Sequence, residues 1–184
     1  STGSTFGNVF NAAGATWAVT VYGGAGDDTI IGGEGNDTLY GRGGNDAISG
    51  NGGNDKLYGD QGIDSLNGGA DNDLLTIDSD DSGVIGGSGF DRVTVSRATS
   101  SITLDLNAGQ IEYVKATAST FANILDATGA TWNVTIFGGS GNDTITGGDG
   151  DDMLYGNGGD DVISGNGGVD NLNGGLGADS LDGV

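Results

Sequence analysis

A nine-residue period runs through most of this chain and constrains its fold more than any other feature. From Gly23 the sequence reads GGAGDDTII, GGEGNDTLY, GRGGNDAIS, GNGGNDKLY, GDQGIDSLN and GGADNDLLT. From Gly138 it resumes as GGSGNDTIT, GGDGDDMLY, GNGGDDVIS, GNGGVDNLN and GGLGADSLD. A short fixed period is typical of proteins in which each structural unit stacks on its neighbours.

Two positions of the nonamer hardly vary. The sixth position is aspartate: Asp28, Asp37, Asp46, Asp55, Asp64, Asp73, Asp143, Asp152, Asp161, Asp170 and Asp179. The eighth position is a large aliphatic residue: Ile30, Leu39, Ile48, Leu57, Leu66, Leu75, Ile145, Leu154, Ile163, Leu172 and Leu181. A disordered acidic linker has no need for a regularly placed aliphatic residue, so the pattern favours a packed fold.

The spacing of these positions indicates an architecture. Each nonamer divides into a six-residue glycine-rich turn and a three-residue strand, so that two nonamers complete one coil of a flattened helix. Glycine readily adopts the positive φ angles that such turns need. In so short a strand only the middle side chain faces inward, and one aliphatic residue per nonamer builds a ladder. The sequence therefore predicts an all-β fold, a parallel β-roll or β-solenoid.

A longer repeat lies over the short one. The segment TFGNVFNAAGATWAVTVYGGAGDDTI from Thr5 matches TFANILDATGATWNVTIFGGSGNDTI from Thr120 at a constant offset of 115 residues. Trp17 and Trp132 hold equivalent places in the two copies, where we expect them to pack against or cap the fold. The expected organisation is a glycine-poor β lead-in at 1–22, a repeat block at 23–94, a β connector with the second lead-in at 95–137, and a second block at 138–184.

The connector carries its own pattern. Apolar residues alternate at Ile102, Leu104 and Leu106 and recur around Ile111 and Tyr113. Period-two alternation is typical of half-buried strands. We therefore expect strands in the connector.

The charge of the chain opposes a compact fold. Asp and Glu number 26 against 5 Lys and Arg, for a formal net charge of -21. At about 1.5–3 kcal/mol for each buried aliphatic side chain, the ladder cannot offset about 1–2 kcal/mol of backbone ordering for every residue. Divalent cations would neutralise the charge, and about ten of them would nearly cancel it. The same charge argues against nucleic acid as a partner, and no run is long enough for membrane insertion.

Stacking brings the sixth-position aspartates together in space. Alternate nonamers lie on the same side of the coil, so aspartates 18 residues apart become neighbours about 4.8 Å apart. The expected pairs are Asp28–Asp46, Asp37–Asp55, Asp46–Asp64, Asp55–Asp73, Asp143–Asp161, Asp152–Asp170 and Asp161–Asp179. Without metal each row is a column of like charges, whereas hard cations turn it into a column of oxygen ligands.

The nonamer resembles the calcium-binding repeat G-G-x-G-x-D-x-U-x of the RTX (repeats-in-toxin, hemolysin-type) family of bacterial secreted proteins. That resemblance implies that each Ca²⁺ lies between successive turns, bound by sixth-position carboxylates and by backbone carbonyls of glycine-rich positions. The implied carboxylates are the eleven above together with Asp91. The implied carbonyl donors are Gly24, Gly26, Gly33, Gly35, Gly44, Gly53, Gly139, Gly141, Gly148, Gly150, Gly159 and Gly168. Roughly seven to ten Ca²⁺ ions would be bound in this way.

The repeat is imperfect near the end of the first block. Residues 77–85 keep Val84 at position eight but carry Ser82 at position six, and Asp71 stands where the motif has glycine. We expect weak or missing sites at these two places. Asp91 restores the motif, but the pattern leaves open whether Asp73 pairs with Asp91 across the irregular stretch.

The resemblance also implies a function. RTX modules pass unfolded through type I secretion machinery and fold in extracellular calcium, where such modules bind at about 10⁻⁴–10⁻³ M. We expect a bacterial extracellular or cell-surface module that folds on Ca²⁺ and serves secretion and scaffolding of a larger exoprotein. Its partners would be calcium ions, flanking domains of the parent protein and the secretion machinery.

Other classes of function remain as alternatives. The chain has no His and no Cys, and therefore no usual general base, thiol nucleophile or zinc site, so we expect no enzymatic activity. It could still be the C-terminal or central module of a secreted enzyme or toxin, or the repeat region of a surface-layer protein or adhesin. An ice- or ligand-binding solenoid ranks last, because it would want a row of Thr at an outward position that reads Ala25, Glu34, Gly43, Gly52, Gln61 and Ala70.

Overall fold

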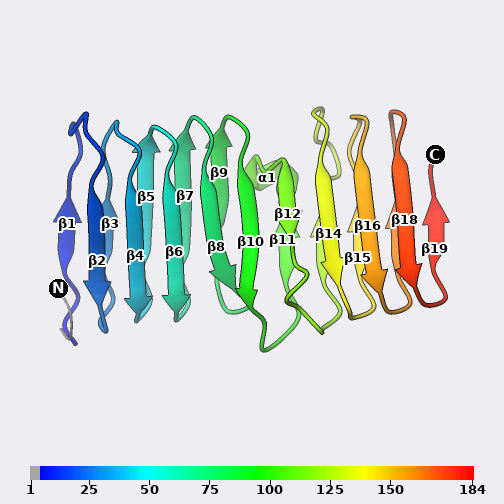
Figure 1. Ribbon diagram of the computed structural model, residues 1–184, viewed down its shortest axis with the longest axis horizontal. Helices are drawn as coiled ribbons and strands as arrows, with labels where there is room; N and C mark the ends of the chain where they lie inside the picture. Colours follow the sequence, from blue (N-terminus) through cyan, green and yellow to red (C-terminus); the bar gives the residue numbers. More distant parts are fainter. Residues whose placement is uncertain (1–4) are drawn as a thin grey trace. The chain divides into compact units, whose positions relative to one another are not determined.

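A computed structural model describes residues 5–184 as an all-β parallel β-solenoid (Figure 1). The chain divides into two compact units, with Val93 ending the first and Thr94 beginning the second. The strand β10 (Arg92–Arg97) runs across this boundary. The predicted fold class is confirmed.

The first unit consists of two parallel sheets that the chain visits in turn. One sheet has the order β1 (Val9–Asn11), β3 (Thr29–Ile31), β5 (Ala47–Gly52), β7 (Ser65–Ala70) and β9 (Ile85–Ser88). The other has the order β2 (Thr20–Gly24), β4 (Thr38–Gly43), β6 (Lys56–Gln61) and β8 (Leu74–Asp78). Ile30 pairs with Ile48, and Leu39 pairs with Leu57, so one coil is two nonamers long.

The second unit has the same construction. One sheet has the order β11 (Thr103–Asp105), β13 (Ile124–Asp126), β15 (Thr144–Thr146), β17 (Val162–Ser164) and β19 (Ser180–Asp182). The other has the order β12 (Tyr113–Lys115), β14 (Thr135–Gly139), β16 (Met153–Gly158) and β18 (Asn171–Leu176). The connector thus forms the strands β11 and β12, as its alternation predicts.

Leu106 departs from that alternation. It opens a helical turn, α1 (Leu106–Gly109), instead of continuing the strand. The Asp105 side chain caps this turn by accepting a 2.8 Å hydrogen bond from the N–H of Ala108. Leu106 is nevertheless fully buried, so its side chain packs in the core although its backbone is helical.

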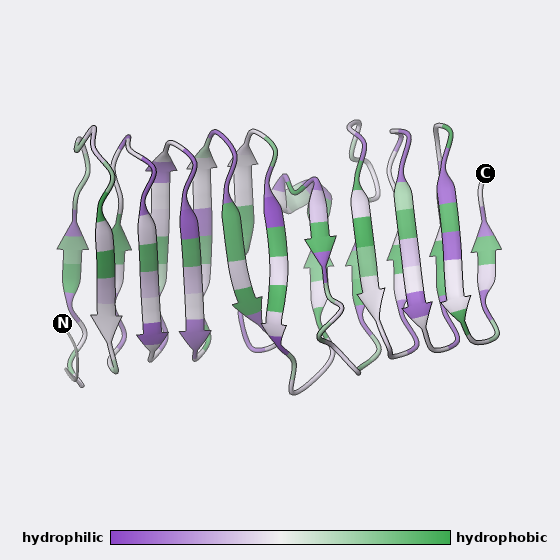
Figure 2. Cartoon of the chain, viewed as in Figure 1, coloured by the Kyte–Doolittle hydropathy of each residue, from purple (hydrophilic) through white to green (hydrophobic). Residues whose placement is uncertain are grey.

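The core is the ladder of eighth-position side chains. Ile30, Leu39, Ile48, Leu57, Leu66 and Leu75 in the first unit, and Ile145, Leu154 and Ile163 in the second, are at most 2% exposed. Figure 2 shows apolar residues recurring in the middle of successive strands while the turns are mostly polar. Leu181 is an exception, because it remains 45% exposed on β19, the last strand of its sheet.

The fourth position of the nonamer shows why the turns need glycine. Gly44 has φ +103°, and a Cβ atom built there would lie 2.5 Å from the carbonyl carbon of Gly26 in the preceding coil. A side chain at Gly44 would therefore press on the backbone of the preceding coil. Asp71 occupies the same position with φ 74°, a conformation that aspartate tolerates better than most residues.

Candidate metal centre

The sixth-position aspartates are buried although each is a charged residue at the edge of a strand. Those of the first block, together with Asp91, Asp143, Asp152 and Asp161, are at most 2% exposed. Asp170 and Asp179 are partly exposed near the last coil of the second unit. Buried carboxylates need hydrogen bonds or a cation, because desolvation penalises the charged form.

Hydrogen bonds link these aspartates from coil to coil. The N–H of Asp28 donates to Oδ1 of Asp46 over 2.7 Å, and the N–H of Asp46 donates to Oδ1 of Asp64 over the same distance. All of the expected pairs form in this manner: Asp28–Asp46, Asp37–Asp55, Asp46–Asp64, Asp55–Asp73, Asp143–Asp161, Asp152–Asp170 and Asp161–Asp179. Each Oδ1 is therefore satisfied by the preceding coil.

The second carboxylate oxygen is different. Within residues 5–184, Oδ2 is buried and accepts no hydrogen bond in Asp28, Asp46, Asp55, Asp64, Asp73, Asp161 and Asp170. This oxygen points at the first glycine of its own nonamer. A Cβ atom at Gly59 would lie 2.5 Å from Oδ2 of Asp64, and one at Gly50 would lie 2.5 Å from the carbonyl oxygen of Gly68 in the next coil. Carboxylate and carbonyl oxygens therefore converge where glycine leaves room.

Three aspartates have both oxygens satisfied. Oδ2 of Asp37 accepts a 2.7 Å hydrogen bond from the N–H of Gly33. Asp143 and Asp152 do the same with Gly139 and Gly148, over 2.6 and 2.8 Å. Each of the three is the first aspartate of its row, next to a glycine-poor lead-in coil that carries Val19, Asn123 or Val134 at the corresponding place. Asp28 also begins a row, beside Asn8, but its Oδ2 accepts no hydrogen bond.

Burial changes the acidity of these groups. It raises the pKa of Asp46, Asp55 and Asp73 from 3.8 to about 7, and like-charged neighbours in the row add to the effect. The pKa of Asp64, Asp91, Asp143, Asp152 and Asp161 is raised for the same first reason. In the absence of a cation, these carboxylates are held in an environment that disfavours their charged form.

The irregular stretch does not break the rows. Asp73 donates its N–H to Oδ1 of Asp91 over 2.8 Å, so this pair, which the sequence pattern leaves open, does form. Asp71 adopts the positive φ that glycine has at the same position in other nonamers, and this preserves the turn. The register is preserved across this stretch too, because Asn67 pairs with Ile85 and Gly69 with Gly87 between β7 and β9, at the usual spacing of 18 residues.

A carboxylate that is absent from the predicted set substitutes for Ser82. The N–H of Asp64 donates to Oδ1 of Asp81 over 3.0 Å, at a spacing of 17 residues instead of 18. Oδ2 of Asp81 accepts from the N–H of Asp78 over 2.8 Å. Burial raises the pKa of Asp81 to about 7 as well. Its position directly before Ser82 is the signal that a one-residue shift in register could restore the row.

Two asparagines of the lead-in coils extend the rows beyond the repeat blocks. Asn8 donates both its N–H and its side-chain amide to Oδ1 of Asp28, over 2.6 and 2.7 Å. Asn123 makes the same two bonds to Asp143, each 2.8 Å long. These bonds span 20 residues, so the nine-residue period gives no sign of them, but Asn8 and Asn123 are related by the 115-residue offset.

A second row of hydrogen bonds runs along the exposed fifth position of the nonamer. The side chain of Asp27 accepts from the N–H of Asn45, and Asn45 accepts in turn from Ile63, over 2.7 and 2.9 Å. Asn142 and Asp160 form the corresponding row with Ala178 in the second unit. Each row ends at an apolar residue, whose backbone N–H donates a hydrogen bond but whose side chain has no acceptor for the next coil. The frequent Asn or Asp at position five of the nonamer is the sequence signal for these rows.

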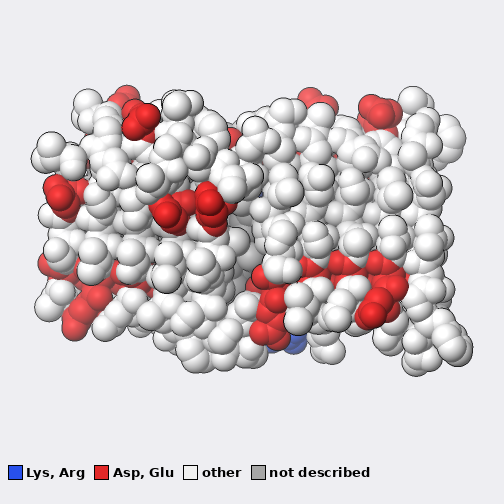
Figure 3. Space-filling model, turned by 180° about the vertical axis from the view of Figure 1, so that it is seen from behind, with Lys and Arg blue, Asp and Glu red and all other residues white. Residues whose placement is uncertain are grey.

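The acidic groups are also organised on the surface. Figure 3 shows bands of carboxylates low on the visible face, with smaller acidic groups near its upper edge and middle and most of the remaining visible surface uncharged. In the described part of the chain, no group of three or more His, Cys, Asp or Glu side chains lies together as a metal site. A cation bound at these turns would therefore need backbone carbonyl oxygens as well as carboxylates.

Comparison with known protein families agrees with this geometry. The RTX calcium-binding nonapeptide repeat matches in four copies, at residues 22–57, 49–82, 135–163 and 146–181. The chain belongs to this family. The RTX matches span both repeat blocks, and Ca²⁺, the ion that these repeats typically bind, suits a site of hard oxygen donors. No curated protein was found to match the chain.

The structure thus contains calcium-binding RTX repeats in a parallel β-roll. Only a non-catalytic repeat module is evident in it. RTX repeats are typical of secreted bacterial proteins. No helix in residues 5–184 is both long and apolar enough to span a membrane.

Proposed function

We propose that this RTX module folds when Ca²⁺ binds outside the bacterial cell, and that calcium-driven folding serves the secretion and scaffolding of a larger exoprotein. The observation that carries the proposal is the set of buried Oδ2 atoms that accept no hydrogen bond. An isolated buried carboxylate oxygen is unfavourable, whereas a hard cation beside carbonyl oxygens stabilises it.

The proposed ligands follow from the turns. The carboxylates with an open Oδ2 would bind first: Asp28, Asp46, Asp55, Asp64, Asp73, Asp161 and Asp170. Asp91 and Asp179 would extend their rows, and the glycines predicted above would supply carbonyl oxygens. We propose that Asp37, Asp143 and Asp152 hold their turns mainly through glycine N–H groups, because both of their oxygens already accept hydrogen bonds. About seven to ten ions remain the proposed total.

Coupling between binding and folding follows from the composition of the interior. The described core contains an aliphatic ladder and rows of buried aspartate in close proximity. The unfolded chain solvates these carboxylates, whereas the folded chain without metal must desolvate them. The free energy of Ca²⁺ binding therefore contributes to the free energy of folding, as in other small metal-dependent domains.

The biological setting is proposed on the same basis. A calcium-poor cytosol would keep the chain unfolded for type I secretion, and extracellular calcium would fold it. The parent protein would contribute flanking domains. The proposed division of the chain is the lead-in 1–22, block 23–94, connector and lead-in 95–137, and block 138–184, which is supported by the repeat matches at 22–82 and 135–181.

Limited proteolysis in calcium and in chelator tests the proposal. We expect the full chain to resist cleavage in millimolar Ca²⁺ and to be degraded in EGTA. Magnesium is the matched control, because Mg²⁺ dehydrates reluctantly and demands octahedral geometry, so it should protect poorly. Equal resistance in chelator and in calcium would refute calcium-driven folding.

A further inference from the structure

The two lead-in coils are copies of each other in sequence but differ in burial. Residues 5–22 and 120–137 correspond at the 115-residue offset. In the second copy Asn123, Leu125, Ala127, Ala130, Val134 and Ile136 are all buried. Their counterparts in the first copy are all partly exposed: Asn8, Phe10, Ala12, Ala15, Val19 and Val21. Similar residues in similar coils must therefore differ in what covers them.

The cover of the second lead-in is known. Strand β11 pairs with β13 in parallel, with Leu104 opposite Leu125. Strand β12 pairs with β14, with Val114 opposite Ile136. The N–H groups of Ile124 and Thr135 donate 2.8 Å hydrogen bonds to the carbonyls of Ile102 and Glu112. A single connector coil, residues 102–119, thus buries the face that the second lead-in presents.

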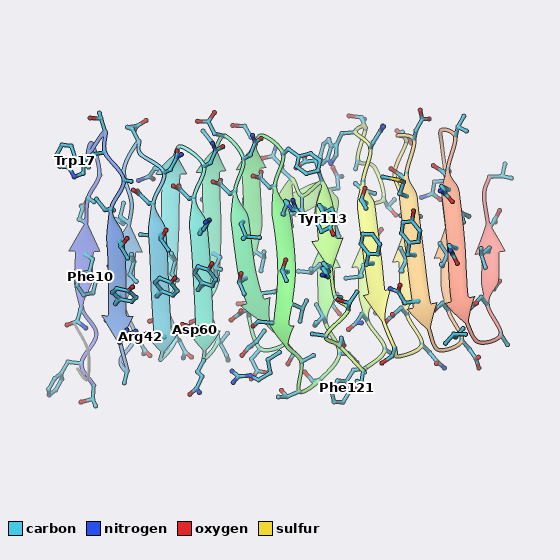
Figure 4. All side chains as sticks on the ribbon, in the orientation of Figure 1. Phe10, Trp17, Arg42, Asp60, Tyr113 and Phe121 are labelled. Atoms are coloured by element: carbon cyan, nitrogen blue, oxygen red, sulfur yellow. The ribbon has the colours of Figure 1, made fainter. Side chains whose placement is uncertain are left out.

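The same face of the first lead-in is open in the described chain. Strands β1 and β2 are terminal in their sheets, and Trp17 is 69% exposed. Trp132, the counterpart of Trp17, is only partly exposed. Figure 4 shows Trp17 beside the first coil and directed away from it. Terminal coils with apolar faces and unpaired strand edges are the parts of a solenoid that need a cap.

We propose that the N-terminal face of the first coil, formed by Phe10, Trp17 and Val21, is a docking surface for a connector coil of the same type as residues 102–119, joined ahead of it in the same polypeptide. The 115-residue repeat, which consists of a lead-in, a repeat block and a connector, would then recur in tandem along the polypeptide. The connector of one 115-residue repeat would cover the lead-in of the next.

Charge supports this occupant over a second copy of the chain. Residues 5–22 contain no charged side chain, and residues 102–119 contain only Asp105, Glu112 and Lys115. If a second copy of the chain stacked end to end on this face, it would place its last coil against the first lead-in. That coil carries Asp170, Asp179 and Asp182 without any basic residue. The linking sequence also fits, because STGST at 1–5 corresponds to ATAST at 116–120.

A graft onto the full chain tests the proposal. Residues 94–115 are duplicated directly ahead of Ser1, in a chain carrying Trp132→Phe so that Trp17 is the sole fluorophore of its kind. Acrylamide quenching of Trp17 is measured in saturating calcium. The W17F chain without the graft gives the reference value for Trp132 under its natural cover. We expect the grafted coil to lower the quenching constant of Trp17 to that reference and to shift its emission to shorter wavelength.

A matched control carries Leu104→Asp and Val114→Asp in the duplicated segment only. This control should leave Trp17 as accessible as it is in the chain without the graft. Equal protection by the control, or no protection by the intact graft in a chain that shows full β circular dichroism, would overturn the proposal. Protection of Trp17 in the chain without the graft, growing with concentration as dimers form in sedimentation velocity, would assign the face to a second copy instead.

A second variant guards against a graft that does not fold. Residues 1–115 are duplicated ahead of Ser1, which places a whole preceding unit at the natural junction. The Trp17 of the downstream copy is kept and the other Trp residues are changed to Phe. This chain should show the same protected Trp17, and an exposed Trp17 in it would contradict the proposal independently.

Discussion

The N–H of Asp28 donates a 2.7 Å hydrogen bond to Oδ1 of Asp46, which lies one coil further along the solenoid. This bond uses one oxygen of the Asp46 carboxylate and leaves Oδ2 buried without a hydrogen bond. The same division between a satisfied and an open oxygen recurs at Asp55 and Asp73. Each of these aspartates therefore clamps the backbone of the preceding coil through Oδ1, and we propose that its Oδ2 binds a cation.

Asp46→Asn tests the role of the open oxygen. The amide keeps an acceptor for the N–H of Asp28 but removes the charge and one carboxylate oxygen, so we expect weaker calcium binding and a lower ion count by isothermal titration calorimetry. The loss should be about 2 kcal/mol or more of calcium-dependent stability, because a buried charged ligand is removed. Asp27→Asn is the matched control. It removes the same charge from an exposed fifth position where asparagine is common, and it should leave the ion count unchanged.

Gly44→Ala tests the close approach of successive turns. Its Cβ would lie 2.5 Å from the carbonyl carbon of Gly26, so the substitution should raise the calcium concentration at the midpoint of folding or abolish folding. Gly14→Ala is the control, because Gly14 also has positive φ, +85°, but nothing lies within 4 Å of its Cβ position. Both variants carry the left-handed penalty of about 1 kcal/mol. Equal effects on the calcium midpoint would show that steric contact between coils is unimportant.

Leu57→Ala tests the aliphatic ladder. Leu57 is fully buried, so its truncation should cost about 2–5 kcal/mol of unfolding free energy, measured by thermal or urea unfolding in saturating calcium. Lys56→Ala on the exposed side of the same strand should change the unfolding free energy by less than about 0.5 kcal/mol. A loss at Leu57 no larger than the loss at Lys56 would mean that the ladder contributes little.

Stability of the calcium-free fold should depend on pH with a definite sign. Burial raises the pKa of Asp46, Asp55 and Asp73 from 3.8 to about 7. The folded form then holds protons that the unfolded form has already lost. These groups favour the fold fully below about pH 4, and that contribution disappears as the pH rises through about 7. In calcium-free buffer, β circular dichroism should therefore grow as the pH is lowered from 8 to 4.

The same protons compete with calcium. Each site that must lose one proton to bind should raise the calcium midpoint by up to about tenfold per pH unit below pH 7. A calcium midpoint that stays constant between pH 8 and pH 6 would contradict the assignment of these aspartates as ligands. The Asp149→Asn variant, which changes an exposed carboxylate, should show the same pH dependence as the parent chain.

Much of this architecture is readable from the period alone. One aliphatic side chain in each nonamer fixes the strand centres, and the 18-residue stacking predicts which aspartates become neighbours. The period cannot predict where the pattern shifts. Asp81 enters the row through a 17-residue hydrogen bond, and Asn8 enters it through a 20-residue one, because local turns lengthen or shorten a coil without changing its sheets.

The sequence pattern also does not predict which aspartates have an Oδ2 atom that accepts a hydrogen bond. Asp37 and Asp55 occupy the same position of the nonamer, yet Oδ2 of Asp37 accepts the N–H of Gly33 while Oδ2 of Asp55 accepts no hydrogen bond. At the second position of the nonamer, Asn51 has φ 75° whereas Gly33 has no positive φ, so the peptide N–H is turned differently before Asp55 and before Asp37. Stacking on a lead-in coil does not decide this alone, because Asp28 also stacks on one and its Oδ2 accepts no hydrogen bond.

Far-UV circular dichroism of the full chain at pH 7.5, followed as calcium is added to a chelator-treated sample, measures whether Ca²⁺ drives folding. We expect a spectrum typical of an unfolded chain without calcium and a cooperative gain of β signal at submillimolar to millimolar Ca²⁺, about 10⁻⁴–10⁻³ M. The signal should be lost again when EGTA is added. A full β spectrum in excess chelator, unchanged by calcium, would show that the rows of aspartate fold without the ions proposed to join them.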